Sequence, residues 1–94
     1  MSDYTDSNRG QEASRLLDSE VLQAALTAIE GAVIEQWESC PARDAEGKEA
    51  LWQLYKTSKK FRGLLLGYVE TGKLAADRIR LQKERGLLGR VLRR

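Results

Sequence analysis

The chain has 94 residues, one cysteine and no histidine, and its net charge is +2. This length allows one small domain with a thin core, and the composition excludes an internal disulfide and a Cys/His zinc site. Oligomerisation is the remaining source of stability. The polar, acidic N-terminus is unlike a secretory signal, and no apolar run approaches the roughly 18–20 residues that span a bilayer. We expect a cytoplasmic protein, unless it leaves within a larger particle, and a membrane partner is not expected.

Charge is divided between the two halves of the chain. Residues 1–47 carry ten acids and three bases, whereas residues 48–94 carry thirteen bases and four acids. The last segment, residues 73–94, has eight bases and two acids. Such a segment favours an anionic partner, which can be a nucleic acid, a membrane surface or an acidic protein, including the acidic half of another copy.

The first strongly periodic segment predicts a helix over residues 19–38. Its apolar residues recur at spacings of four, three and four: Leu22, Leu26, Ile29 and Val33. Asp18 or Ser19 is a suitable N-cap. Before this helix we expect a short amphipathic turn at residues 12–17, and we expect residues 1–10 to be frayed.

A hinge follows at residues 39–43, where Pro41 disfavours a continuing helix. Asp44 is the expected N-cap of the next helix. Trp37 and Trp52 flank the hinge, and we expect them to pack against each other at the closed end of a helical hairpin. An exposed aromatic binding site is the alternative.

The second helix is predicted over residues 45–71. Its heptad seam consists of Leu51, Leu54, Ser58, Phe61, Leu65 and Tyr68. The apolar surface is wider than one helix can cover, so the seam residues Leu51, Leu54, Phe61, Leu65 and Tyr68 are the candidate oligomer interface. Gly63 and Gly67 indicate a close helix–helix approach, with a local bend as the alternative.

Beyond Gly72 the pattern weakens, because Leu74, Ile79 and Leu81 do not share one clean face. We expect a helix at residues 73–85 and a short amphipathic turn at residues 87–93 that becomes ordered on contact with a partner. The fold class is therefore all-α: an antiparallel helical hairpin with a basic C-terminal helical arm, as an oligomer. Its predicted parts are a flexible acidic N-terminus (residues 1–14), a hairpin domain (15–72) and the basic arm (73–94).

No motif predicts catalysis. Residues 67–73 match the first seven positions of a phosphate-binding loop, but Leu74 replaces the Ser or Thr, and no strand precedes. We interpret this segment as a helix that stops at Gly72. Cys40 is interpreted as a surface residue, and Glu30, Glu35 and Glu38 as a solvated face. We expect no enzyme activity and no catalytic, metal or cofactor-binding residues.

Several short motifs carry a resemblance: the helix from Leu22 to Trp37, Pro41-Ala42-Arg43-Asp44, Gly47-Lys48-Glu49, Leu51-Trp52 and residues 70–75, Glu-Thr-Gly-Lys-Leu-Ala. Over residues 15–76 the chain resembles short, uncharacterised helical proteins encoded among the head and packaging genes of tailed bacteriophages. The resemblance implies a virion or virion-assembly protein, present in the virion and, during assembly, in the host cytoplasm. It carries over no functional residues.

Two functions are open. The first is a homo-oligomeric structural or assembly protein that docks to a larger phage protein (portal, capsid or tail). The second is an accessory protein that binds DNA independently of sequence during packaging, because arginine suits phosphate contact but residues 73–94 contain no aromatic residue for base stacking. For either function the candidate partner-binding arm is Arg78, Arg80, Lys83, Arg85, Leu87, Leu88, Arg90, Val91, Leu92, Arg93 and Arg94.

Overall fold

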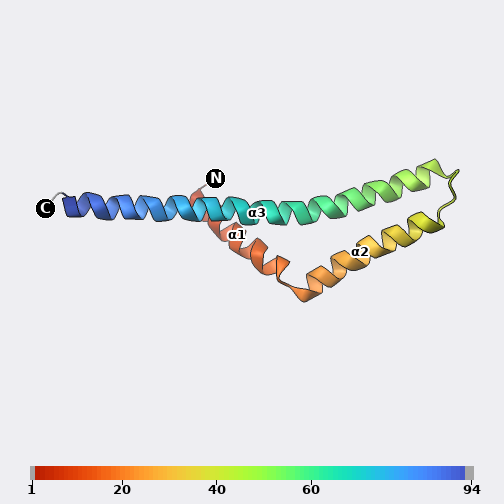
Figure 1. Cartoon of the computed structure of the whole chain (residues 1–94), viewed down its shortest axis with the longest axis horizontal. Helices are drawn as coiled ribbons and strands as arrows, with labels where there is room; N and C mark the ends of the chain where they lie inside the picture. Colours follow the sequence, from red (N-terminus) through yellow and green to blue (C-terminus); the bar gives the residue numbers. More distant parts are fainter. Residues whose placement is uncertain (1, 93–94) are drawn as a thin grey trace. The chain divides into compact units, whose positions relative to one another are not determined.

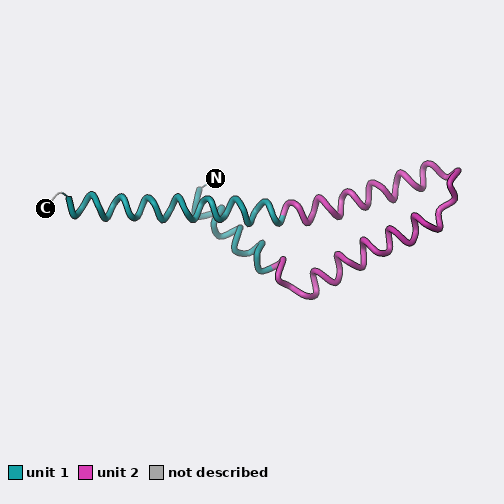
Figure 2. Tube along the Cα trace, viewed as in Figure 1, with its two compact units in different colours: residues 1–15, 65–94 teal, residues 16–64 magenta. Residues whose placement is uncertain are grey.

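The computed structural model describes residues 2–92 and is helical, with no strand in that range. The helices are α1 (Asp3–Leu17), α2 (Glu20–Ser39) and α3 (Ala45–Leu92) (Figure 1). The chain divides into two compact units, which are coloured separately in Figure 2. Unit 1 comprises residues 1–15 and 65–94, and unit 2 comprises residues 16–64. The all-α prediction is confirmed.

Helix α1 corrects the expectation for the N-terminus, because residues 3–10 are helical rather than frayed. The helix begins where the Ser2 hydroxyl accepts a hydrogen bond from the Thr5 N–H at 3.1 Å, which satisfies one of the free amides of the first turn. Asp3 and Asp6 lie in that turn, where negative charge is favourable to the helix dipole.

Helix α2 begins and ends close to its predicted limits. Ser19 is the N-cap, and its hydroxyl accepts a hydrogen bond from the Leu22 N–H at 3.2 Å. The helix ends in the turn before Pro41, where the Cys40 N–H donates to the Trp37 carbonyl at 3.2 Å. The next helix starts as predicted, because an Asp44 carboxylate oxygen accepts from the Gly47 N–H at 2.9 Å.

Helix α3 is longer than predicted. It continues without interruption from Ala45 to Leu92, so the expected stop at Gly72 and the expected break at Gly86 are both wrong. A glycine that ends a helix usually adopts a positive φ, and no described glycine does so. The segment that resembles a phosphate-binding loop is therefore ordinary helix.

Within unit 1, α1 packs against the second part of α3 through small residues. A Cβ added to Gly10 would lie 2.8 Å from the Gly72 Cα, and one added to Gly72 would lie 2.7 Å from the Gly10 Cα. Ala13 and Ala75, three residues further along each helix, are 3% and 0% exposed. The backbones therefore meet closely, and only glycine fits at the two central positions.

Within unit 2, Leu26 and Val33 of α2 and Ser58 of α3 are buried. The close approach expected at Gly63 and Gly67 does not occur within the described chain, because an added Cβ at either position would meet nothing within 4 Å. Glycine mediates a close helix–helix contact in this protein, but at Gly10 and Gly72.

Candidate functional site

The last turns of α3 carry four exposed apolar side chains, and basic residues lie close to them in the sequence. The exposed fractions are 61% for Leu87, 59% for Leu88, 61% for Val91 and 82% for Leu92. Four described bases are interspersed with them on exposed positions: Arg80, Lys83, Arg85 and Arg90. Arg93 and Arg94, which the sequence also assigns to the arm, lie outside the described residues. The described arm is a continuous helix rather than the separate short turn that was predicted.

Helix α1 reaches the beginning of this arm. Arg78 Nε donates a hydrogen bond to Oδ1 of Asp3 at 3.1 Å, and Arg78 Nη2 forms an ion pair with the same oxygen at 3.0 Å. Further along, Tyr4 lines a hollow together with α3 residues between Ile79 and Arg90. Arg78 is thus engaged within its own chain, although the sequence places it among the partner-binding bases. Among the described residues, the arm residues that follow Arg78 have no ion pair of this kind with α1.

The predicted oligomer seam is divided by the structure. Leu65 is 8% exposed and Leu51 is half-buried, so a single chain already covers much of both side chains. Leu54, Phe61 and Tyr68 remain 49%, 46% and 38% exposed. Because only this second set has substantial area left, it is the part of the seam that another molecule can cover.

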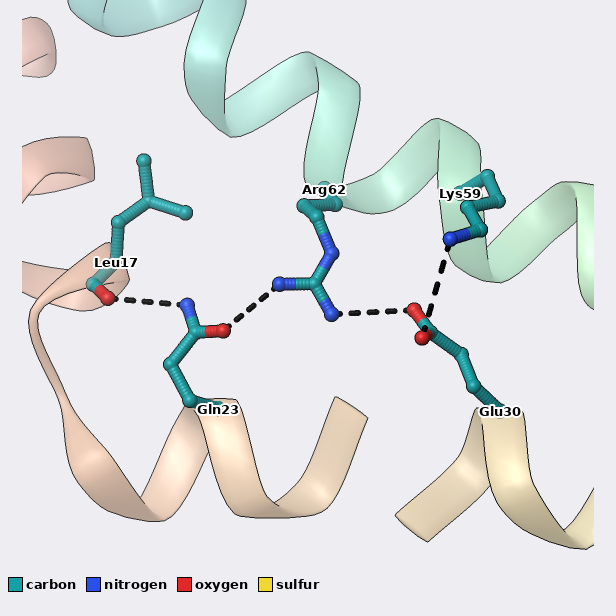
Figure 3. A network of polar contacts seen from close by, with 5 residues as sticks. All are labelled: Leu17, Gln23, Glu30, Lys59 and Arg62. Carbon is teal, nitrogen blue, oxygen red and sulfur yellow. Dashed lines mark hydrogen bonds and ion pairs between the residues drawn. The ribbon is translucent and has the colours of Figure 1, made fainter. Parts of the chain in front are cut away.

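A polar network in unit 2 joins α2 to α3 (Figure 3). Arg62 donates from Nη1 to the Gln23 side-chain oxygen at 2.7 Å and from Nη2 to a Glu30 carboxylate oxygen at 3.1 Å. The Gln23 amide nitrogen donates to the Leu17 carbonyl at 3.0 Å, and Lys59 Nζ lies 3.9 Å from the other Glu30 oxygen. Sequence reasoning missed this network, because it assigned Glu30 to a solvated face.

The Glu30 carboxylate is favoured in its charged form. The hydrogen bond from Arg62 lowers the pKa of Glu30 below its usual 4.5, partial burial opposes this effect, and the charge of Lys59 adds to it. A signal was present in the sequence: Arg62 interrupts the apolar pattern of α3 at a half-buried position. A partly buried base of this kind usually has an acidic partner.

The aromatic residues near the turn line one open hollow in unit 2, together with Val33, Ile34 and Leu51. Trp52 stacks on Tyr55, with ring centroids 5.9 Å apart, and Lys48 Nζ lies 4.5 Å from the Trp37 ring centroid. Among the described residues Trp37 and Trp52 form no ring pair with each other, although both line this hollow. Trp37 and Trp52 keep 39% and 46% of their surface exposed.

Other candidate chemistry is sparse. Cys40 Sγ lies 3.7 Å from an Asp44 carboxylate oxygen, which does not activate a thiol. In the range 2–92 no group of three or more metal-ligating side chains comes together, and no helix there is long and apolar enough to cross a membrane. The arm of α3 is therefore the leading candidate for a functional surface. No protein family, curated protein or solved structure matches the chain.

Proposed function

We propose that this chain is a non-enzymatic structural or assembly protein of a tailed-phage particle, which self-associates through α3 and docks to a larger virion component through its basic arm. The observation that carries the proposal is the exposure of Leu87, Leu88, Val91 and Leu92, between 59% and 82%, on a helix that also carries arginines. Apolar side chains of this size on a helix end are typical of a docking surface.

The proposed scaffold for this surface is an antiparallel hairpin of α2 and the first part of α3. Contacts in unit 2 support it: Gln23 meets Arg62, Glu30 meets Lys59, and the Trp37 carbonyl meets Lys48 Nζ at 3.1 Å. From one contact to the next, the residue number rises in α2 and falls in α3. This is the order that two antiparallel helices joined by a turn require.

The assignment to a phage particle rests on the resemblance of residues 15–76 to short helical proteins of phage head and packaging genes. The proposed partner is a larger structural protein such as a portal, capsid or tail protein. The proposed locations are the virion and, during assembly, the host cytoplasm.

The proposal is tested by cosedimentation of the purified chain with phage particles that lack it. We expect the double substitutions Leu87→Ala/Val91→Ala and Leu88→Ala/Leu92→Ala each to reduce retention at least tenfold, because apolar anchors in a desolvated contact carry most of the binding free energy. Single alanine substitutions of Arg80 or Arg90 serve as controls and should reduce retention less, because charges at the rim contribute little.

Binding to duplex DNA is the competing outcome. With a net charge of +6 on residues 73–94, neutralising six phosphates would give a log–log slope of affinity against salt of about −5. Tight, salt-sensitive DNA binding by the wild-type chain, together with full particle retention by both apolar double variants, would contradict the docking proposal.

A further inference from the structure

One face of α3 is exposed opposite the face that packs on α1. Leu74, Leu81 and Leu88 are spaced seven residues apart and are 60%, 45% and 59% exposed. At about 100° per residue, Leu81 lies about 180° around the helix from Gly72, which is buried against α1. A heptad repeat of leucines is typical of a helix that pairs with another helix. Within the described residues of unit 1, these leucines form an apolar stripe that other elements leave largely uncovered.

Glycines in this part of α3 give a second, independent observation. A Cβ added at Gly67 or Gly89, which lie within about 80° of Leu81 around the helix, would meet nothing within 4 Å. Glycine in a helix interior is unfavourable relative to alanine, so it lowers the stability of the helix at these positions. No close packing inside the chain offsets this loss. Gly10 and Gly72 show what such a glycine can provide, namely room for another helix. The two glycines therefore indicate large side chains arriving from outside.

We propose that a second copy of this chain docks antiparallel on this face, over residues 66–89, with the two-fold axis between Asp77 and Arg78. This register brings each residue opposite the one whose number adds with it to 155, over a length of about 36 Å. Large side chains then meet small ones, leucine meets leucine, and acid meets base: Gly67 with Leu88, Leu66 with Gly89, Leu74 with Leu81, and Glu70 with Arg85.

Charge selects this orientation. Among the described residues, Glu70 and Arg85 have no ion pair, and the antiparallel register joins them twice, once at each end of the contact. A parallel, in-register pair would instead bring Glu70 to Glu70 and Arg85 to Arg85. Asp77, which lies nearest the axis, is 3.4 Å from Arg80 of its own chain, so its charge is balanced there.

This inference deepens the self-association part of the proposed function by naming its surface, its partner and its orientation. The predicted seam residues Leu54, Phe61 and Tyr68 lie on a different face of α3, so they are not needed for this contact. Leu87 and Val91 also lie outside the leucine stripe. Particle retention of the Leu87→Ala/Val91→Ala variant therefore reports on docking, whereas the oligomer measured below reports on this contact.

The test is a charge reversal measured by sedimentation equilibrium of the full chain. We expect the wild type to form a dimer, Glu70→Arg and Arg85→Glu each to weaken dimerisation at least tenfold, and the double reversal to restore it to within about threefold. Arg90→Glu is the matched control: it makes the same charge change on the same helix, about 180° from Leu81, and should leave the dimer unchanged.

A cysteine pair tests the register. In a Cys40→Ser background, Glu70→Cys/Arg85→Cys should form disulfide-linked dimers, whereas Glu70→Cys/Leu81→Cys should not, because the second pair is offset by about 6 Å along the helix. A wild-type monomer, a double reversal no better than the single reversals, or equal cross-linking of both pairs would overturn the proposal. Loss of particle docking with an intact dimer would overturn only the proposed function.

Discussion

The two compact units cover the same long helix in different ways. In unit 1, α1 meets α3 backbone to backbone at Gly10 and Gly72, and no side chain fits between them. In unit 2, α2 meets α3 through long polar side chains, with Arg62 reaching both Gln23 and Glu30. The contact in unit 1 requires that no side chain lies between the two backbones. The contact in unit 2 requires the charged and polar side chains that connect the helices. The two units should therefore fail under different perturbations.

The largest expected effect is the loss of α1 when α3 is shortened. A chain ending at Gly72 lacks Ala75, which is fully buried, and Arg78, which pairs with Asp3. We expect its α1 amides to exchange as in an unfolded segment, while α2 and residues 45–64 keep their protection, as measured by hydrogen exchange. A chain ending at residue 86 retains these contacts and is the control. Protection of α1 in the shorter chain equal to that in the control would contradict this view.

A bulky residue at the glycine crossing should have the next largest effect. Gly72→Leu forces the two backbones apart, and we expect it to lower the free energy of unfolding by about 2–3 kcal/mol in urea denaturation followed by circular dichroism. Gly31→Ala is the control, because nothing lies within 4 Å of an added Cβ there. It should instead stabilise the chain by about 1 kcal/mol through helix propensity. Equal effects of the two substitutions would show that the crossing is not tight.

Unit 2 should respond to pH instead. The pKa of Glu30 is lower in the folded chain than its usual 4.5, so its ion pair stabilises the fold above that pH. This contribution is lost as the pH falls through the lowered folded pKa. We expect Glu30→Gln to be less stable than wild type at pH 7 and close to wild type at pH 2, in urea titrations at each pH.

Glu35→Gln is the matched control, because Glu35 is exposed and belongs to the same helix. It should leave the pH dependence of stability unchanged. If Glu30→Gln shows the same loss of stability on acidification as the wild type, the network does not stabilise the fold.

The smallest expected effect is at Ser58, whose buried hydroxyl has no hydrogen-bond partner at normal geometry among the described residues. The hydroxyl is nevertheless close enough to the Glu30 carboxylate to help lower the pKa of that group, so it is weakly paired at best. Ser58→Ala removes this poorly paired buried hydroxyl from the α2–α3 contact, and we expect it to raise the free energy of unfolding by up to about 1 kcal/mol. Thr57→Ala, one position away on the exposed face, should change stability by less than about 0.5 kcal/mol. A loss of stability in Ser58→Ala would mean that the hydroxyl is paired.

The elements that the sequence predicts well have strong local signals. The N-caps Ser19 and Asp44 are polar residues placed just before periodic apolar segments, and both accept the expected backbone hydrogen bonds. Helix α1 has no such periodic signal, because its buried positions are Gly10 and Ala13. Gly72 and Ala75 of α3 repeat the Gly-x-x-Ala spacing of Gly10 and Ala13 in α1. This repeated spacing was the signal in the sequence for the contact between the two helices.

The apparent disorder of the apolar pattern beyond Gly72 has a physical reason. Ile79 lies on the side of α3 that faces α1, whereas Leu74 and Leu81 lie on the opposite side. These residues do not share a face because the helix has two apolar faces. A pattern test that assumes one covered face therefore predicts an irregular segment. The division of the chain at residue 72, and the role of the arm, stay predictions that the variants above test.

Helix α3 packs on α1 with one face, and we propose that it packs on a second chain with the other. Light scattering on the eluted peak of wild type and Leu81→Glu tests this most directly, because Leu81 is 45% exposed and its replacement should leave a single chain intact. We expect wild type to have the mass of two chains, and Leu81→Glu to have the mass of one, with an unchanged circular dichroism spectrum. A two-chain mass for the variant, or a one-chain mass for wild type, would contradict the claim.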